Sequence, residues 1–333
     1  MTVDKALHMA FSRAKLLTGL VATTALVLTG CSGDDGGSAD GGDSYTIGIN
    51  QLVQHPALDS ATEGFKQAFA DAGVDVDFDE QNANGEQATA LTIAQQMASD
   101  NLDLALAVAT PAAQAMAQNL VDTPLLFTAV TDPVEAELVE SMEVPGGNVT
   151  GTSDAAPIEE QLELLKEIVP DAETVGIVYA SGEVNSQVQV DQATEAAGPL
   201  GLTVETQTVT TVNEIQQAVE ALGDVDVIYV PTDNMVVSGI ASLVQVAESK
   251  QIPVIAAEEG TVDGGAVATI GIDYTELGRQ TGEMALRILQ DGADPATMPV
   301  ETAAEFTYVV NEAAAERQGV TIPSDILAEA EKK

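Results

Sequence analysis

The sequence contains no tryptophan, one cysteine and only two histidines. A single cysteine cannot form an internal disulfide or a cysteine-rich metal site. With so few histidines we expect neither a zinc site nor a hydrolytic triad. No glycine loop of the phosphate-binding kind is found, and GTSDA (151–155) lacks the second glycine of a nucleophile elbow. We therefore expect no metal, no cofactor and no enzyme activity.

Aromatic residues are also scarce, at 3% of the chain. Glycoside chemistry between two carboxylates remains the one enzymatic alternative in a chain so rich in acids. Such chemistry needs sugar subsites lined by aromatic side chains, and this composition does not favour them.

Basic residues are few: 11 Lys and Arg stand against 53 Asp and Glu, for a formal net charge of −42. The acids are dispersed along the chain rather than clustered. Such a surface repels phosphate backbones, so we expect no binding to nucleic acid. Dispersed acidity of this extent serves solubility and suits a saline medium, in which screening relieves the self-repulsion.

The first 30 residues have the layout of a secretory signal. Lys5, Arg13 and Lys15 precede an apolar stretch at 16–28 that is too short to span a bilayer. The letters LTGC (28–31) resemble a bacterial lipobox, which implies that Cys31 is acylated and becomes the first residue of the mature protein. A lone buried thiol, the alternative, would have apolar neighbours. Residues 31–44 instead form a flexible tether rich in Gly, Asp and Ser.

From residue 45 onward, strand and helix signals alternate. We predict strands at 45–50, 74–80, 102–109 and 124–130, with helices at 58–72, 86–99, 111–120 and 133–141. The pattern then restarts, with strands at 174–180, 202–209, 225–230 and 253–258 and helices at 185–197, 213–222 and 235–249. Alternation of this kind is typical of parallel sheets with crossover helices on both faces. We expect an α/β protein with two doubly wound parallel-sheet lobes.

The two halves also resemble each other in sequence. Residues 102–117 align with 225–240, and residues 123–139 align with 252–268, which indicates an internal duplication. Two such lobes would leave a ligand cleft between the carboxyl ends of their strands.

A further strand, helix and strand follow at 266–273, 274–292 and 306–311. We infer that this segment crosses back to the first lobe and that the last strand returns to the second. The expected division is a first lobe of 45–150 plus about 271–297 and a second lobe of 151–270 plus about 298–330. Several crossings of this kind make a hinge.

Several motifs carry a resemblance to a known family: HPALD (55–59), AVTDPVEAELV (129–139), GTSD (151–154), VPTDN (230–234) and GIDYTELGRQTGEMALRIL (271–289). Together with the lipobox, they resemble the ABC-transporter substrate-binding lipoproteins of the tryptophan/tyrosine type. The resemblance implies a type I periplasmic-binding-protein fold outside the cell membrane. It also implies that the lobes close on a small molecule, often an aromatic amino acid, for delivery to a permease driven by a separate ATPase. With so few aromatic residues, the chain departs from the family in offering fewer side chains to stack on an aromatic ligand.

A zwitterionic amino acid needs donors for its carboxylate and an acceptor for its ammonium. Thr110 and Thr131 each follow a strand and begin a helix, where a carboxylate binds well, although plain N-capping requires the same residue types. Asp132 either contacts the ligand or caps its own helix. Asp233 and Asn234 hold the position in the second lobe that Thr110 holds in the first, and Asp233 is the preferred ammonium acceptor.

Other candidates lie in the remaining loops at strand ends. Ser153 and Asp154 lie where the chain first crosses between lobes, and Asp154 is a second possible ammonium acceptor or a helix cap. Asn185 and Ser186 follow the first strand of the second lobe, where they contact the ligand or begin a helix. Gln54 and His55 occupy the corresponding loop of the first lobe. A His-Pro pair is more typical of a turn than of a catalytic base.

We therefore expect a monomeric solute receptor of an ABC importer, anchored outside the cell membrane by lipid alone, with an amino acid or similar small polar metabolite as ligand. The alternative is a sugar or autoinducer sensor that signals by docking to a membrane receptor. Neighbouring genes for a permease and an ATPase would favour import, and a neighbouring histidine kinase would favour sensing.

Overall fold

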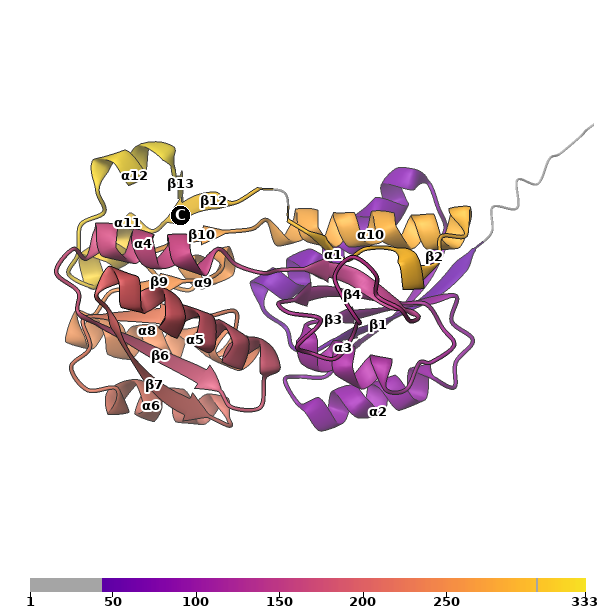
Figure 1. The fold of residues 1–333 in the computed structure, drawn as a ribbon, viewed down its shortest axis with the longest axis horizontal. Helices are drawn as coiled ribbons and strands as arrows, with labels where there is room; N and C mark the ends of the chain where they lie inside the picture. Colours follow the sequence, from indigo (N-terminus) through magenta and orange to yellow (C-terminus); the bar gives the residue numbers. More distant parts are fainter. Residues whose placement is uncertain (1–43, 304) are drawn as a thin grey trace, which may run out of the picture. The chain divides into compact units, whose positions relative to one another are not determined.

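The computed structural model describes residues 44–303 and 305–333. The predicted signal segment, Cys31 and all but the last residue of the tether lie outside the described residues. In the described part, helices and strands alternate along two sheets, as the sequence predicts for an α/β protein with two lobes (Figure 1).

The first lobe is built on a six-stranded sheet in the order β11-β5-β4-β3-β1-β2, in which every pairing is parallel. Its strands are β1 (Tyr45–Gln51), β2 (Val76–Asn82), β3 (Leu104–Val108), β4 (Leu125–Val130), β5 (Val149–Ser153) and β11 (Glu301–Thr302). All five residues of β3 are buried, because helices cover both faces of a central parallel strand. The edge strand β2 is only partly buried.

Helices cover both faces of this sheet (Figure 1). The pairs are α1 (Pro56–Ala72) with α10 (Tyr274–Asp291), and α2 (Gln87–Met97) with α3 (Thr110–Ala117). Glycines bring α1 and α10 close together. A Cβ atom on Gly278 would lie 1.9 Å from the carbonyl oxygen of Ala61, so only glycine permits this approach.

The second lobe contains a seven-stranded sheet in the order β13-β12-β10-β9-β8-β6-β7. Its strands are β6 (Thr174–Ala180), β7 (Thr203–Val209), β8 (Val227–Val230), β9 (Val254–Ala256), β10 (Ala268–Gly271), β12 (Thr307–Val310) and β13 (Glu331–Lys332). Only the pairing of β10 with β12 is antiparallel. Its helices are α4 (Ile158–Ile168), α5 (Val184–Ala197), α6 (Ile215–Ala221), α7 (Asn234–Ser238), α8 (Ile240–Lys250), α9 (Glu259–Asp263), α11 (Glu312–Arg317) and α12 (Ser324–Glu329).

Two separate hydrophobic clusters lie in this lobe. One packs side chains of α4 and α5 against the sheet, and the other packs side chains of α6 and α8. The lobe is therefore doubly wound, with a core on each face of its sheet.

The two sheets share one strand order. Read from the edge, β2-β1-β3-β4-β5 corresponds to β7-β6-β8-β9-β10. The sequence segments that align with each other contain β3 and β8 in one pair and β4 and β9 in the other, so aligned segments occupy equivalent positions.

The chain passes between sheets three times: after β5, after β10 and after β11. The expected division between residues 150 and 151 falls within β5, all of which belongs to the first sheet. The expected return to the second lobe at about 298 is also early, because β11 pairs with β5 in the first sheet.

Two helix predictions were wrong. Residues 133–141 form turns instead of a helix, because Glu137 has a φ of 58° and the right-handed helix cannot continue through it. Residues 235–249 form two helices, α7 and α8, which are separated at Gly239. A Cβ atom there would lie 2.5 Å from Ile215 Cδ1, so the Ile215 side chain would have to shift if this residue were larger than glycine.

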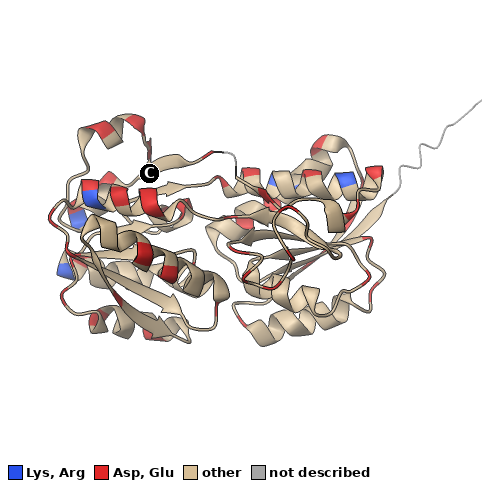
Figure 2. Ribbon diagram, in the orientation of Figure 1, with Lys and Arg blue, Asp and Glu red and all other residues tan. Residues whose placement is uncertain are grey.

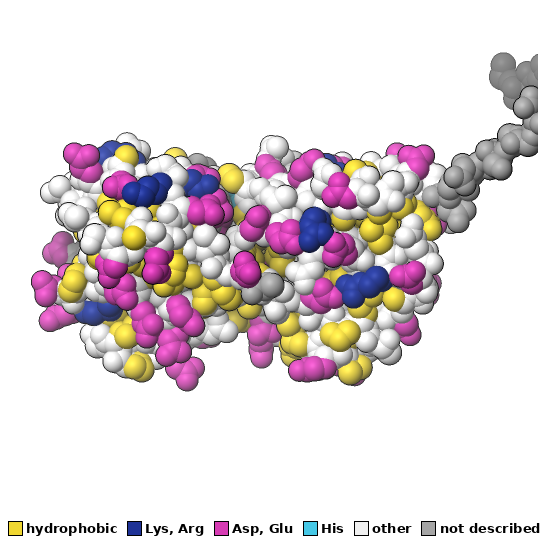
Figure 3. Space-filling model, turned by 90° about the horizontal axis from the view of Figure 1, so that it is seen from above, with side chains coloured by type: hydrophobic (Ala, Val, Ile, Leu, Met, Phe, Trp, Pro, Cys, Tyr) yellow, Lys and Arg dark blue, Asp and Glu magenta, His cyan; other side chains and the backbone are white. Residues whose placement is uncertain are grey.

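Acidic side chains are spread over both lobes (Figures 2 and 3). Most of the few basic residues in the described part pair with acids at the surface, as Arg279 does with Glu276 and Glu283, whereas Lys166 and Lys250 donate to backbone carbonyl oxygens. None of the helices in the described ranges has the length and apolar character needed to cross a membrane.

Candidate functional site

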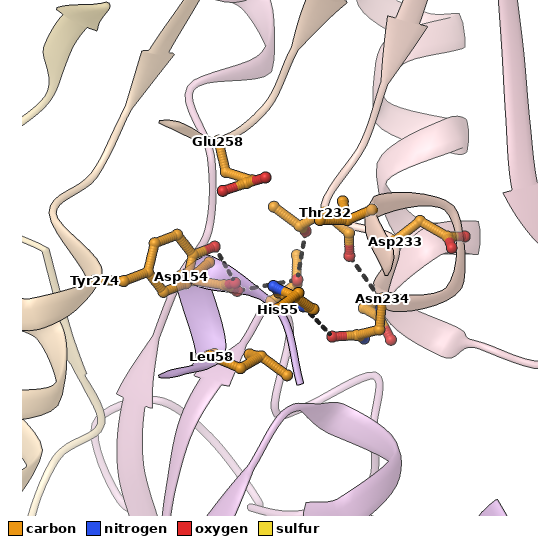
Figure 4. Close-up of a pocket in the computed structure, with 13 residues that line it drawn as sticks. His55, Leu58, Asp154, Thr232, Asp233, Asn234, Glu258 and Tyr274 are labelled. Carbon is orange, nitrogen blue, oxygen red and sulfur yellow. Dashed lines mark hydrogen bonds between the residues drawn. The ribbon is translucent and has the colours of Figure 1, made fainter. Parts of the chain in front are cut away.

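A cavity lies where the carboxyl ends of the strands of both sheets meet. The free space inside it is small, about 10 Å³, which is roughly the room that one water molecule needs. His55, Thr131 and Asp154 follow strands of the first sheet, whereas Asn185, Thr232–Asn234, Glu258 and Tyr274 follow strands of the second. This is the edge at which open α/β sheets place their ligands. Figure 4 shows side chains from both lobes converging there.

Asp154 lies at the first crossing between lobes and is 5% exposed. The Thr131 hydroxyl donates to its Oδ1 (3.0 Å), and the Tyr274 hydroxyl donates to its Oδ2 (2.8 Å). Burial raises the pKa of Asp154, although these two hydrogen bonds oppose the shift. The Thr131 hydroxyl also lies 3.3 Å from the Thr232 hydroxyl of the second lobe. This network therefore contains residues of both lobes.

Glu183 lies beneath the second-lobe side of the cavity. Its carboxylate accepts hydrogen bonds from the side-chain amides of Asn185 (3.0 Å) and Asn234 (2.6 Å) and from the backbone N–H of Met235 (3.1 Å). Burial, reinforced by the charge of Asp233, raises the pKa of Glu183 to about 7. Glu183 thereby fixes two amide side chains that line the cavity.

His55 reaches across the lobes. Its Nε2 lies 3.5 Å from Oδ1 of Asn234, and its Nδ1 is buried without a partner. Burial lowers the pKa of His55 to about 4, which keeps the imidazole neutral at physiological pH.

Asp233 lines the cavity, but its carboxylate serves the fold of the second lobe. Oδ1 accepts from the backbone N–H of Val236 and so caps α7, and Oδ2 accepts from the backbone N–H of Ala180 at the end of β6. Figure 4 shows this carboxylate turned away from Asp154 and Tyr274. The sequence favours Asp233 as the ammonium acceptor, but both of its carboxylate oxygens already accept hydrogen bonds from backbone N–H groups.

Five candidates from the sequence do not line this cavity: Gln54, Thr110, Asp132, Ser153 and Ser186. Gln54 is exposed, whereas Thr110 and Ser186 are buried outside the lining.

Asp132 and Ser153 instead stabilise the local backbone. Asp132 accepts from the N–H groups of Val134 and Glu135, which is the capping role considered as its alternative. Ser153 donates to the carbonyl oxygen of Thr131.

Four residues of the site were not predicted from the sequence: Glu183, Thr232, Glu258 and Tyr274. Glu258 follows β9, is 2% exposed and accepts from the N–H of Gly260 (2.7 Å) and from the hydroxyl of Thr261. All four follow a strand of the second sheet. The rule that ligands bind at carboxyl ends would have found them had it been applied to every strand.

The cavity wall is poor in aromatic residues. Tyr274 is the one aromatic side chain among its lining residues, and Leu58 and Val237 supply apolar surface. Phe65, Phe69 and Phe78 pack edge to face within the first lobe instead.

Charges of only one sign line the cavity. Asp154, Asp233 and Glu258 are among its lining residues, and no Lys or Arg is. Within the described ranges, no group of three or more His, Cys, Asp or Glu side chains is arranged to hold a metal ion.

Comparison with known proteins identifies the family. The sequence model of the family described as ABC transporter substrate binding protein matches residues 46–333. The chain is 44% identical over 298 residues to a tyrosine-binding protein of Clostridioides difficile (strain R20291), covering 86% of each chain. The chain belongs to this family of ABC transporter substrate-binding proteins.

Solved structures agree with this assignment. A domain from Streptococcus pneumoniae in complex with L-Trp is 38% identical, with a TM-score of 0.84 over 87% of this chain and 99% of that chain. The ligand-free, open structure of a substrate binding protein with adhesive properties from Clostridium difficile is 44% identical, with a TM-score of 0.67 over 87% of this chain and 99% of that one. The fold is thus that of a two-lobed periplasmic binding protein with a cleft between its lobes.

Proposed function

We propose that this protein captures an amino acid, most favourably an aromatic one, in the interlobe cavity and delivers it to a membrane permease. The observation that carries the proposal is a cavity lined from both lobes by buried acceptors and carboxylates, with no basic side chain among the lining residues. A ligand must then supply the cation, as an α-ammonium group does.

Asp154 is the proposed ammonium acceptor in place of Asp233. Its two partners are the hydroxyls of Thr131 and Tyr274, and each carboxylate oxygen retains a lone pair for a further donor. The proposed ligand contacts also include His55, Asn185 and Asn234. The Thr131 hydroxyl already donates its proton to Asp154. The ligand carboxylate therefore accepts hydrogen bonds from backbone N–H groups, or from the Thr131 hydroxyl after it turns away from Asp154.

The arrangement of the lobes supports a closed form. The chain superimposes better on the L-Trp complex than on the ligand-free, open relative, although the open relative is closer in sequence. In the closed arrangement, Gln87 Nε2 donates to the carbonyl oxygen of Gly182 across the lobes (2.8 Å).

A thermal-shift screen with amino acids, sugars and nucleobases tests the ligand class. A ligand at 100 times its dissociation constant adds about 2.7 kcal/mol to stability, which raises the midpoint by about 5 °C or more. We expect L-tyrosine or L-tryptophan to give the largest shift. A response to sugars alone would favour the sensor alternative and contradict the proposal.

We also propose that Cys31 is lipidated and holds the protein outside the cell membrane. The support is the LTGC motif after a basic and apolar segment. Cys31→Ser should move the protein from the membrane fraction to the medium or periplasm while the folded part still binds its ligand. Retention of the Cys31→Ser protein in salt-washed membranes would refute the lipid anchor.

A further inference from the structure

Two buried acceptor atoms at the cavity have no hydrogen-bond partner: His55 Nδ1 and Asn185 Oδ1. The two residues come from opposite lobes, and both line the cavity. His55 is 8% exposed and Asn185 is 3% exposed. An unpaired polar atom at this depth costs about 1–3 kcal/mol. Two such atoms at one binding cavity therefore point to hydrogen-bond donors on the ligand.

The orientation of Asn185 follows from its neighbours. Its Nδ2 lies 2.9 Å from the backbone carbonyl oxygen of Thr232 and 3.0 Å from a carboxylate oxygen of Glu183. A carbonyl oxygen can only accept, so the NH₂ end must face these two groups. The other end, Oδ1, is therefore an acceptor.

Glu183 fixes Asn234 in the same way. Each carboxylate oxygen of Glu183 accepts a backbone N–H, from Asn234 (3.2 Å) and from Met235 (3.1 Å), so the group acts as an acceptor. Asn234 Nδ2, at 2.6 Å from the same carboxylate, must then be the donor. This leaves Asn234 Oδ1 facing His55.

The tautomer of His55 follows. Asn234 Oδ1 is an acceptor that faces Nε2 at 3.5 Å, longer than the roughly 2.7–3.2 Å of a good N–H···O bond, and an acceptor on this side favours a proton on Nε2 over one on Nδ1. A neutral imidazole carries one proton, so Nδ1 is an acceptor. In Figure 4 the ring of His55 lies between Asn234 and Asp154.

We propose that His55 Nδ1 and Asn185 Oδ1 accept hydrogen bonds from N–H or O–H groups of the ligand, and that Glu183 is a positioning residue that enforces this through Asn234. Because His55 and Asn234 belong to different lobes, the tautomer is fixed only when the lobes come together. The site therefore selects donor-rich ligands such as a primary ammonium and disfavours ligands that present an acceptor at this position. The identity of the ligand in this inference rests on the proposed function. The tautomer of His55 rests only on contacts within the protein.

Nitrogen NMR of the full chain labelled with ¹⁵N-histidine tests the tautomer, with L-tyrosine and L-tryptophan as probes. A His55→Gln sample identifies the His55 signals against those of His8. We expect a protonated Nε2, and an unprotonated Nδ1 whose shift changes as it accepts a hydrogen bond from the probe. A protonated Nδ1 in the bound protein would overturn the inference. Absence of any response to amino acids would instead count against the proposed function.

The positioning role has its own variant. Glu183→Leu removes the acceptor that holds Asn234 Nδ2, so we expect the His55 signals to show a mixture of tautomers. Glu205→Leu, at an exposed glutamate of the same lobe, is the matched control and should leave the spectrum unchanged. If Glu183→Leu folds and retains the Nε2-protonated form alone, Glu183 does not position His55. If it fails to fold, the wild-type spectrum still decides the tautomer.

Ligand analogues distinguish whether His55 accepts its hydrogen bond from the ammonium group or from the phenol O–H of L-tyrosine. Desamino-tyrosine lacks the ammonium, and L-phenylalanine lacks the phenol O–H. His55→Phe should weaken L-tyrosine binding about tenfold, the worth of one hydrogen bond. For the analogue that lacks the partner of His55, the same substitution should change affinity little. Equal losses with all three probes would contradict the proposal.

Discussion

At the scale of single residues, buried carboxylates without basic partners dominate the site. Asp154, Glu183, Asp233 and Glu258 are each at most 6% exposed. Moving a charge out of water costs several kcal/mol, and burial raises the pKa of all four. Hydrogen bonds from backbone N–H groups or hydroxyls offset part of this cost. A cationic ligand would offset more, which is why we assign the ammonium to this cavity.

The sequence could place several residues at the cavity but not decide their roles. His55, Thr131, Asp154, Asn185 and Asn234 lie there because each follows a strand end, which periodicity predicts, although their contact with a ligand stays a prediction.

The role of Asp233 depended on the direction of its carboxylate. That direction is set by the backbone N–H of Ala180, 53 residues away. Such long-range partners are not visible in local sequence.

At the scale of elements, an irregular pairing of β4 with β5 positions the first-lobe side of the site. The register shifts between Phe127 and Val130, and Ala129 has a φ of 55°. Gly151 of β5 approaches β4 so closely that a Cβ atom would lie 2.0 Å from the carbonyl oxygen of Phe127. Thr131 and Asp154 follow these two strands directly, so this pairing sets the distance between them.

Substitution of Gly151 tests this account. Gly151→Ala should force β5 away from β4, since overpacking in a core typically costs about 1–3 kcal/mol. We expect a lower unfolding midpoint in chemical denaturation and weaker binding of L-tyrosine. Gly147→Ala, in the preceding loop with nothing within 4 Å of the added carbon, should change neither. Wild-type stability in Gly151→Ala would show that the strands can adjust.

The predicted strands and most of the predicted helices are present, whereas the helices predicted at 133–141 and 235–249 were wrong. The buried strand β3 is a short unbroken apolar run, which is typical of a central strand in a parallel sheet. Residues 133–141 also have helical composition, but the left-handed Glu137 ends the turn after Asp132 has capped it. Composition alone does not reveal such a backbone conformation.

At the scale of the whole described chain, direct polar contacts between the lobes are single hydrogen bonds. They join Gln87 to Gly182, Thr131 to Thr232 and His55 to Asn234. Three crossings hold the lobes in one unit, yet these few bonds contribute only about 1 kcal/mol each. A ligand that contacts both lobes would therefore add a large share of the energy that favours the closed form.

Calorimetric titration of L-tyrosine and L-tryptophan into the protein tests this central claim most directly, with Asp154→Asn compared against Asp71→Asn. Asp71 is an exposed acid of α1 and serves as the control. We predict one site per chain, unchanged affinity for Asp71→Asn, and a loss of about 2 kcal/mol or more, roughly thirty-fold, for Asp154→Asn. Equal affinities for the two variants, or a wild-type protein that binds neither amino acid, would contradict the account.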